Sequence, residues 1–427
     1  MKILSLTAGA GNMYCGSCLH DNSLAAELLR QGHDVTLLPL YTPPRTEEAS
    51  VSAGRVFFGG ISVYMAERFP LFRRLPRALN RVLDAPKLIS AFAGHGVETD
   101  PRLLGRLTVS LLRGESGHHG HEIRKLAGWL RAQPLPDVVT LPYTLLIALA
   151  EPLRRELDRP VTCSLQGEEF FLEGLQEPWK SEALALIRAQ VGSVDAFVAV
   201  SRYCAGFMSR YLGIPDFKIH VVPLGIRLAG HGPRPPREDG EYRIGFLGRV
   251  APEKGLHLLA EAYRLLRAKE GLPRTRLVAA GYLPPEHRGY LEEVRRTMDD
   301  GFEYLGELDR ESKIAFLKSL DVFSLPCTYD EPKGLPVIEA MANGVPVVQP
   351  RRGSFPEMLA ECGGGLLVEP DSAEALAAAL AQLATDRDLA ASLGRQGFHA
   401  VHRGRGIDLE AASTVEVYRS LHAAGPT

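Results

Sequence analysis

The sequence has little of several features that mark particular classes of protein. Its six cysteines are scattered over 427 residues, which argues for free thiols and against a disulfide framework. No run of about 18 or more apolar residues occurs, so no membrane-spanning helix is predicted. Lys and Arg total 49 against 51 Asp and Glu, and the resulting net charge of -2 gives no reason to expect nucleic acid as a partner.

The first residues, "MKILSLTAGAG", form a short apolar run that ends in glycines. This pattern predicts a strand and a loop, not a signal peptide, and we expect a soluble, cytoplasmic protein. Residues 67–92 interleave arginines with Phe and Leu. We interpret them as a helix with a solvated arginine face over a core-facing stripe, with peripheral contact to an anionic membrane surface as the alternative.

Short runs rich in Val, Ile and Leu alternate with segments of helical periodicity along most of the chain. Parallel sheets that are covered on both faces have such apolar strands. The predicted strands are residues 2–6, 34–40, 137–141, 161–165, 196–201, 242–248, 276–281, 302–306, 321–326, 345–349 and 365–369. The fold class is therefore α/β, with two doubly wound, Rossmann-like parallel-sheet domains and a cleft between them.

The predicted domain boundaries follow from changes in composition. Residues 1–228 form the first domain, with a less regular, helical insert over about 44–135. Residues 229–241 are rich in Gly, Pro and charge, and they read as a poorly packed linker. Residues 242–405 form the second domain, and a C-terminal helix and tail follow over 406–427.

The stretch "GFLGRVAPEKGL" (245–256) combines a strand, a glycine-rich turn and the start of a helix. It carries Arg249 and Lys254. Backbone N–H groups at a helix N-terminus favour an anion, and two cations beside them suit a diphosphate. The alternative is that this stretch is an ordinary turn followed by surface cations that bind no ligand.

The stretch "YDEPKGLPVIEAMANGVPVV" (329–348) holds Glu331 and Glu339 with seven residues between them. Gly334 allows close approach of the backbone to a ligand, and Pro336 suits the first turn of a helix. We therefore predict Glu331 in the loop before a helix and Glu339 about one turn inside it. Both carboxylates would then face the same ligand.

Together, "GRVAPEKG", "EPKGLPVIEA" and "GSFPEML" (353–359) resemble the donor domain of retaining glycosyltransferases of family 4. The resemblance implies the GT-B architecture, in which two Rossmann-like domains face each other across a cleft and the C-terminal helix crosses back to the first. It implies a nucleotide-sugar co-substrate, no other cofactor and no metal, and transfer with retention to a small-molecule, lipid or glycan acceptor.

The resemblance also implies roles for single residues. Arg249 and Lys254 would contact the donor diphosphate, Glu331 would lie near the transferred sugar, and Glu339 would bind the ribose hydroxyls. Further donor contacts are implied at Gly248, Leu308 near the base, Lys333, Gly334, Leu335 and, in the first-domain loop, Gly11 and Gly16.

That first-domain loop, "AGAGNMYCGSC", has the spacing G-x-G-x4-G, which departs from the dinucleotide-binding pattern and argues against NAD. The resemblance implies that this loop faces the cleft and contributes either to the acceptor pocket or to closure over the donor phosphates, with Asn12 as an acceptor-side candidate. Members of the family usually carry a His in the segments that correspond to "DVVTLPYT" and "LQGEEF", and both lack one here. Gln166, Glu168 and Glu169 are candidate replacements, with an ordinary polar helix start as the alternative.

Two further motifs favour structural roles. Cys15 and Cys18 form a lone C-x2-C pair, and His118–Glu122 lie in what we interpret as a solvated loop, so we predict no metal site. Two other functions remain open beside the transferase. One is a non-catalytic nucleotide-sugar binding protein, and the other is a thiol- or metal-controlled module at Cys15 and Cys18.

Overall fold

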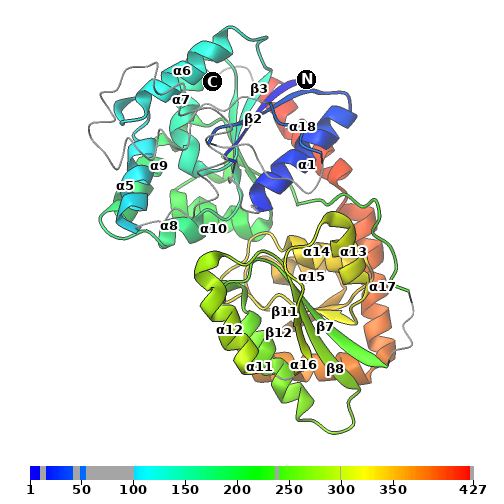
Figure 1. The fold of residues 1–427 in the computed structure, drawn as a ribbon. Coiled ribbons are helices and arrows are strands. Elements are labelled where there is room, and N and C mark those ends of the chain that lie inside the picture. The colour runs from blue at the N-terminus through cyan, green and yellow to red at the C-terminus, as the bar shows by residue number, and fades with distance from the viewer. Residues whose placement is uncertain (10–15, 42–48, 54–100, 236–239, 299, 424–427) are drawn as a thin grey trace. The chain divides into compact units, whose positions relative to one another are not determined.

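The computed structural model describes residues 1–9, 16–41, 49–53, 101–235, 240–298 and 300–423. The chain divides into two compact units. The first unit comprises Met1–Pro223 and Glu410–Thr427, and the second comprises Leu224–Leu409. In each unit, helices lie on both faces of a parallel sheet (Figure 1).

The first unit is built on a six-stranded sheet of order β2-β1-β3-β4-β5-β6. Leu4 of β1 pairs with Thr36 of β2 on one side and with Val139 of β3 on the other. Its strands are β1 (Lys2–Thr7), β2 (Asp34–Pro39), β3 (Val138–Leu141), β4 (Val161–Leu165), β5 (Ala196–Ala199) and β6 (Ile219–Val221). Its helices are α1 (Gly16–Arg30), α5 (Pro101–Leu112), α6 (Gly120–Arg131), α7 (Ala150–Leu157), α8 (Glu169–Glu173), α9 (Trp179–Gln190), α10 (Arg202–Leu212) and α18 (Ile407–Ala423).

The last helix, α18, completes the core of the first unit. Val415 and Tyr418 pack with Ile3 of β1, Leu28 of α1 and Val138 of β3. The Tyr418 hydroxyl also lies 3.0 Å from Oγ1 of Thr140. Burial of these apolar side chains stabilises the return of the chain to the first unit.

The second unit is built on a six-stranded sheet of order β12-β11-β10-β7-β8-β9. Gly245 of β7 pairs with Phe323 of β10 and with Val278 of β8. Its strands are β7 (Glu241–Leu247), β8 (Arg274–Ala280), β9 (Phe302–Tyr304), β10 (Val322–Phe323), β11 (Val347–Pro350) and β12 (Gly365–Val368). Its helices are α11 (Leu256–Arg267), α12 (Arg288–Arg296), α13 (Arg310–Lys318), α14 (Leu335–Ala342), α15 (Phe355–Cys362), α16 (Ala373–Thr385) and α17 (Arg387–Gly404).

The predicted pair of doubly wound α/β domains is confirmed, but some strands differ from the prediction. The short edge strand β6 was missed. The strand predicted over 321–326 is limited to Val322–Phe323. Beyond it, Ser324 donates its hydroxyl to the Val348 carbonyl at 2.6 Å, and the Leu325 N–H donates to the Gln349 side chain. Side-chain hydrogen bonds thus replace the regular ladder where the chain leaves the sheet.

The predicted linker and the predicted insert each lie only partly within the described residues. The Gly- and Pro-rich stretch that begins at residue 229 packs on the second unit. There, the Arg234 guanidinium donates to the Leu320 carbonyl at 2.6 Å and to Asp321 at 3.0 Å. The described part of the predicted helical insert contains the helices α5 and α6, whereas residues 54–100, which include the arginine-rich segment 67–92, lie outside the described residues.

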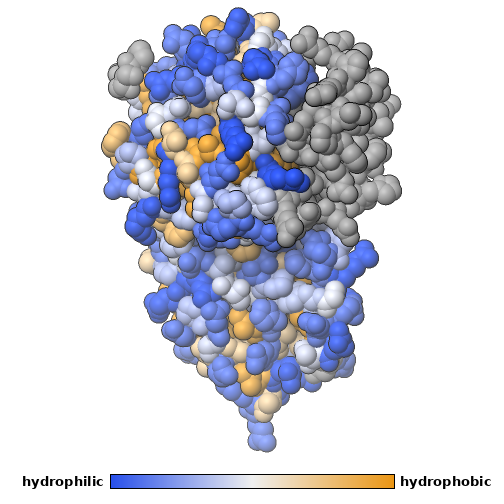
Figure 2. Space-filling model, turned by 90° about the vertical axis from the view of Figure 1, so that its left-hand side faces the viewer, coloured by the Kyte–Doolittle hydropathy of each residue, from blue (hydrophilic) through white to orange (hydrophobic). Residues whose placement is uncertain are grey.

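No helix in the described part of the chain is both long and apolar enough to cross a membrane. The described residues on the face in Figure 2 are mostly hydrophilic, with hydrophobic residues gathered in smaller areas.

Candidate active site

The order of the strands in the second unit places two loops beside each other. β7 and β10 are neighbours, but the chain continues from β7 toward β8 and from β10 toward β11, on opposite sides. A crevice forms at the carboxyl ends of parallel strands where the order reverses in this way. Residues 248–255 follow β7 and carry Arg249 and Lys254, and residues 324–334 follow β10 and carry Glu331.

The two loops are joined by close backbone contacts. The Thr328 N–H donates to the Glu253 carbonyl at 2.9 Å. Gly255 has a φ of +78°, and a Cβ there would lie 1.9 Å from the Pro326 carbonyl oxygen. Only glycine tolerates both this φ and this approach. The loops therefore hold their side chains in a fixed relation.

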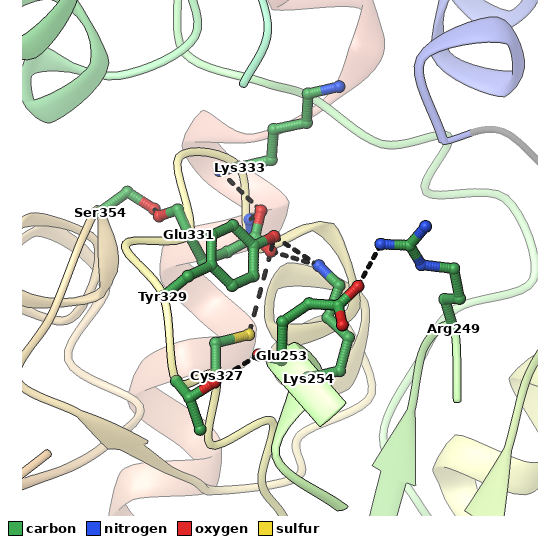
Figure 3. Close-up of polar contacts among 10 residues, drawn as sticks. Arg249, Glu253, Lys254, Cys327, Tyr329, Glu331, Lys333 and Ser354 are labelled. Atoms are coloured by element: carbon green, nitrogen blue, oxygen red, sulfur yellow. Dashed lines mark hydrogen bonds and ion pairs between the residues drawn. The ribbon is translucent and has the colours of Figure 1, made fainter. Parts of the chain in front are cut away.

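Lys254 and Glu331 form the centre of the candidate site (Figure 3). Nζ of Lys254 lies 2.6 Å from Oε2 of Glu331, and the Tyr329 hydroxyl is hydrogen-bonded to the same oxygen. The other oxygen, Oε1, accepts the N–H of Lys333 at 3.1 Å and that of Gly334 at 3.4 Å. The backbone N–H groups of Lys333 and Gly334, which were predicted to contact the donor, thus donate to the Glu331 carboxylate in this structure.

Both members of the pair are charged at neutral pH. Glu331 is only 5% exposed. Burial alone would raise the pKa of Glu331, but the Lys254 ammonium and the hydrogen bonds from Tyr329 and Lys333 outweigh it and lower that pKa to about 2. Burial likewise opposes the charged form of Lys254, and the Glu331 carboxylate more than compensates, so the pKa of Lys254 is raised.

A third segment supports the backbone of Glu331. The N–H and the hydroxyl of Ser354 donate to the Glu331 carbonyl at 2.8 and 2.9 Å. The neighbouring Arg352 donates to Asp371 through both terminal nitrogens, and its Nη1 also donates to the Cys327 carbonyl at 3.4 Å. Ser354 belongs to the predicted "GSFPEML" motif, but nothing in the sequence indicated that it contacts Glu331.

Arg249 lies beside this pair and is exposed. Its guanidinium forms an ion pair with Glu253, which comes from the same loop. In Figure 3 the two side chains point toward each other next to Lys254. The positive charge of Arg249 counteracts the rise in the pKa of Lys254, so the two cations act on each other electrostatically. Such a pair of cations suits a dianionic group.

Glu339 has a cationic partner of its own. The helix α14 starts at Leu335 and places Glu339 about one turn inside, as predicted. Oε1 of Glu339 lies 2.8 Å from Nζ of Lys313 on α13. The half-buried Leu308 lies in the segment between β9 and α13. Glu331 and Glu339 thus pair with different lysines.

Two further donor-side candidates, Gly248 and Lys333, lie on the loops that follow β7 and β10. The Gly248 N–H donates to the Ala280 carbonyl at 3.1 Å. A Cβ on Gly281 would lie 2.0 Å from the Gly248 carbonyl oxygen, so the loops after β7 and β8 touch through their backbones. The side chain of Lys333 points away from Glu331 in Figure 3, although its N–H donates to that carboxylate.

In the first unit, Glu168 connects the loops that follow β3 and β4. Its carboxylate accepts the Thr144 N–H and hydroxyl at 3.0 and 2.9 Å and the Gln166 N–H at 2.8 Å. The Gln166 side chain donates to the Pro142 carbonyl at 3.0 Å. Glu169 is buried at the start of α8. These contacts favour the alternative of a polar, structural helix start for Glu168.

The other first-domain candidates are placed only in part. Gly16 is the exposed first residue of α1, whereas Gly11, Asn12 and Cys15 lie outside the described residues. Cys18 is buried in α1. His119 is buried just before α6, so the prediction of a solvated loop is wrong for this residue. In the described part of the chain, no group of three or more His, Cys, Asp or Glu side chains is arranged to hold a metal ion.

A small cavity of about 40 Å³ lies in the first unit. Polar residues of α1, β4 and α18 line part of it, and His20 Nε2 lies 2.6 Å from Oε1 of Glu410. Asp21 accepts the Thr7 hydroxyl at 2.8 Å beside it. The volume has room for a few water molecules only. The sequence did not single out His20 or Glu410, because their partnership depends on α18 returning to this unit.

Two family models match the chain. The model for glycosyl transferases group 1 matches residues 233–400, and that for glycosyltransferase family 4 matches residues 94–229. The chain is 31% identical to a phosphatidyl-myo-inositol mannosyltransferase of Mycolicibacterium smegmatis over 298 residues. This alignment covers 68% of this chain and 70% of that protein. For a D-inositol 3-phosphate glycosyltransferase of Streptomyces scabiei, at 28% identity, the match covers about half of each chain, 53% and 54%.

Solved structures show the same fold. Sucrose-phosphate synthase of Thermosynechococcus elongatus aligns over 99% of both chains with a TM-score of 0.73 at 19% identity. The Anabaena protein HepE, solved with UDP and glucose, aligns over 98% of this chain with a TM-score of 0.67 at 16% identity. The paired six-stranded parallel sheets and these relatives together show that the chain belongs to the family 4 glycosyltransferases and has the two-domain, Rossmann-like GT-B fold.

Proposed function

We propose that the protein transfers a sugar from a nucleoside-diphosphate sugar to an acceptor hydroxyl, with retention of anomeric configuration and without a metal ion. The observation that carries this proposal is the Lys254–Glu331 pair, 2.6 Å apart at the carboxyl ends of β7 and β10. It places a cation and a carboxylate at the point where doubly wound sheets bind nucleotides.

The proposed chemistry uses both charges. As the bond between the anomeric carbon and the phosphate oxygen breaks, negative charge grows on the diphosphate, where Lys254 and Arg249 stabilise it. The anomeric carbon becomes oxocarbenium-like, and the Glu331 carboxylate stabilises that positive charge. The acceptor oxygen forms the new bond on the same face, and its proton passes to the leaving phosphate oxygen. The balance of atoms and charge requires no metal.

The nucleoside would lie toward α13 and α14. Glu339 is a hydrogen-bond acceptor for the ribose hydroxyls in this proposal, and its 2.8 Å pairing with Lys313 holds the carboxylate in place. Leu308 would supply apolar contact to the base. Among the structural relatives, HepE has been solved with UDP-glucose. Among the relatives in sequence, one mannosyltransferase is named as GDP-mannose-dependent. Sugars carried on uridine or guanosine diphosphate are therefore the first donors to test.

The acceptor is a small molecule, a lipid or a glycan in this proposal. Relatives whose names include phosphatidylinositol or inositol phosphate make polyhydroxylated acceptors the first class to test. The acceptor side would be formed by the first unit, where Gln166 and Glu169 remain candidates.

A thermal-shift screen of UDP, GDP and their sugars, followed by turnover assays, tests the proposal. We expect stabilisation by one nucleotide and turnover of its sugar in the presence of EDTA. Arg249→Ala should lower kcat about 100-fold or more, as loss of one preorganised charge contact does. Arg295→Ala is a matched control, because Arg295 pairs with Glu292 at 2.7 Å on α12.

The assays also separate the alternatives. A protein that binds a nucleotide sugar without any turnover would be a non-catalytic binding protein. A folded protein that neither binds nor turns over any common nucleotide sugar would refute the proposal altogether.

A further inference from the structure

The Tyr329 hydroxyl bridges the two charged groups of the candidate site. It lies 2.6 Å from Nζ of Lys254 and is hydrogen-bonded to Oε2 of Glu331 (Figure 3). The Lys254 ammonium also lies 4.8 Å from the centre of the Tyr329 ring. Since an ammonium can only donate, the phenol oxygen accepts a hydrogen bond from Lys254, and the phenol O–H donates a hydrogen bond to the Glu331 carboxylate.

The two oxygens of Glu331 have different kinds of partner. Oε1 accepts the backbone N–H groups of Lys333 and Gly334, which are fixed by the turn before α14. Oε2 accepts from Lys254 and Tyr329, and the Cys327 sulfur lies 3.9 Å away. One oxygen is therefore held by backbone and the other by side chains.

In the proposed reaction, Lys254 also contacts the donor diphosphate. Any movement of its ammonium toward the phosphates weakens the 2.6 Å contact with Oε2. A buried carboxylate oxygen that loses its donor is strongly destabilised. Among the described contacts of Oε2, the Tyr329 hydroxyl is the strong side-chain donor that remains once Lys254 has moved.

We propose that Tyr329 is a positioning residue for sugar transfer, whose hydroxyl keeps Glu331 charged and oriented while Lys254 shifts toward the diphosphate. The inference rests on the proposed function and deepens it. It assigns to Tyr329 no contact with the substrate.

The environment of the phenol fits this role. Burial, followed by the negative charge of Glu331, raises the pKa of Tyr329 well above its ordinary value, so the group remains a neutral donor. Among the described residues, the charged groups near Glu331 include Lys254, which contacts it directly, the Arg249–Glu253 pair next to it, and Arg352, which pairs with Asp330 and Asp371. The Cys327 thiol is neutral because burial raises its pKa.

Tyr329→Phe tests the inference, because it removes the hydroxyl and keeps the ring under the Lys254 ammonium. The matched control is Tyr211→Phe in the first unit, which removes a phenol bonded to Glu173 at 2.7 Å. Binding of UDP and GDP is measured by calorimetry, and turnover of UDP-glucose and GDP-mannose is measured as a function of pH.

We expect Tyr329→Phe to bind the nucleotide within about threefold of the wild type but to lose about tenfold to a hundredfold in kcat, as loss of a hydrogen bond to a charged group does. The acidic limb of the kcat profile should move to higher pH, because Glu331 loses a donor to its charged form. Tyr211→Phe should change neither quantity.

An unchanged kcat and acidic limb in Tyr329→Phe would overturn the inference while leaving the proposed function intact. Equal losses of nucleotide binding and turnover, with no shift of the limb, would show a merely structural tyrosine. If Tyr329→Phe does not fold, difluorotyrosine at position 329 gives the same test: a more acidic phenol should move the limb to lower pH. Wild-type protein that turns over no nucleotide sugar would overturn the proposed function, and this inference with it.

Discussion

Nζ of Lys254 lies 2.6 Å from Oε2 of Glu331, although 77 positions separate the two residues in the sequence. The strand order of the second unit creates this contact, because β7 and β10 are neighbours and each ends in one of the two loops. The same pair carries the proposed chemistry and much of the local electrostatic stability, so variants at these positions should change both.

Lys254→Met should lower the free energy of unfolding by about 1–3 kcal/mol, because it leaves a buried carboxylate with fewer donors. The double variant Lys254→Met/Glu331→Gln should regain part of that loss, since it has no unpaired charge, and should remain inactive. Urea denaturation of the four proteins of this cycle measures the coupling. A double variant whose stability is the simple sum of the two single losses would contradict the ion pair.

The stability of the protein should also depend on Glu331 at acidic pH. The pKa of Glu331 is lowered from 4.5 to about 2 on folding, so the folded protein binds this proton less readily than the unfolded chain. The contribution is fully present above the unfolded pKa and is lost as pH falls through the folded one. The advantage of the wild type over Glu331→Gln should therefore shrink between about pH 5 and pH 2, as measured by denaturation at several pH values. A constant difference over this range would argue against a depressed pKa.

Gly255→Ala should destabilise the site more than the same change at Gly271. Both glycines have a φ of +78°, so both alanines cost backbone strain of about 1–2 kcal/mol. Only at Gly255 would the new Cβ meet a neighbour, the Pro326 carbonyl oxygen at 1.9 Å, whereas nothing lies within 4 Å at Gly271. Thermal denaturation and nucleotide binding compare the two variants. Equal effects would show that strain alone decides the outcome.

Glu168→Gln should destabilise the first unit by about 1–3 kcal/mol, because an amide NH2 would face one of the N–H donors that the carboxylate now accepts. Glu182→Gln is the control: Glu182 pairs with Arg113, and its side chain is 37% exposed. The control should stay within about 0.5 kcal/mol of the wild type. A stable Glu168→Gln protein with impaired transfer would instead favour the acceptor-side role.

Local features of the sequence account for much of the fold. In the second unit, Gly334 caps α14 and Pro336 lies in its first turn, as predicted for this proline. β4 is observed as predicted, because its five apolar or small residues are bounded by proline and glycine turns. The strand predicted over 321–326 is observed only at Val322–Phe323, since beyond it the side chains of Ser324 and Gln349 make hydrogen bonds that no periodicity reveals.

The candidate site was predictable to a similar extent. The motifs predicted Arg249, Lys254, Glu331 and Glu339 as site residues, and these assignments stay predictions, but the motifs did not indicate the partner of each residue. Tyr329 stands two residues before Glu331 in the sequence and gave no signal of its own, and Ser354 lies on a separate loop. Glu168 was predicted as an acceptor-side candidate, whereas the structure shows it holding two loops together.

The sequence by itself determined the α/β alternation, the two doubly wound units and the charged motifs from which the candidate site is built, because periodicity, glycine turns and charged motifs act over a few neighbouring residues. The tertiary structure alone decided which charges meet. Lys254 reaches Glu331, Lys313 reaches Glu339, and His20 reaches Glu410 only after strand order and the return of α18 bring distant segments together. The ion pair and the hydrogen bonds from Tyr329 and Lys333 then outweigh burial and keep Lys254 and Glu331 charged, and no local pattern in the chain specifies these contacts.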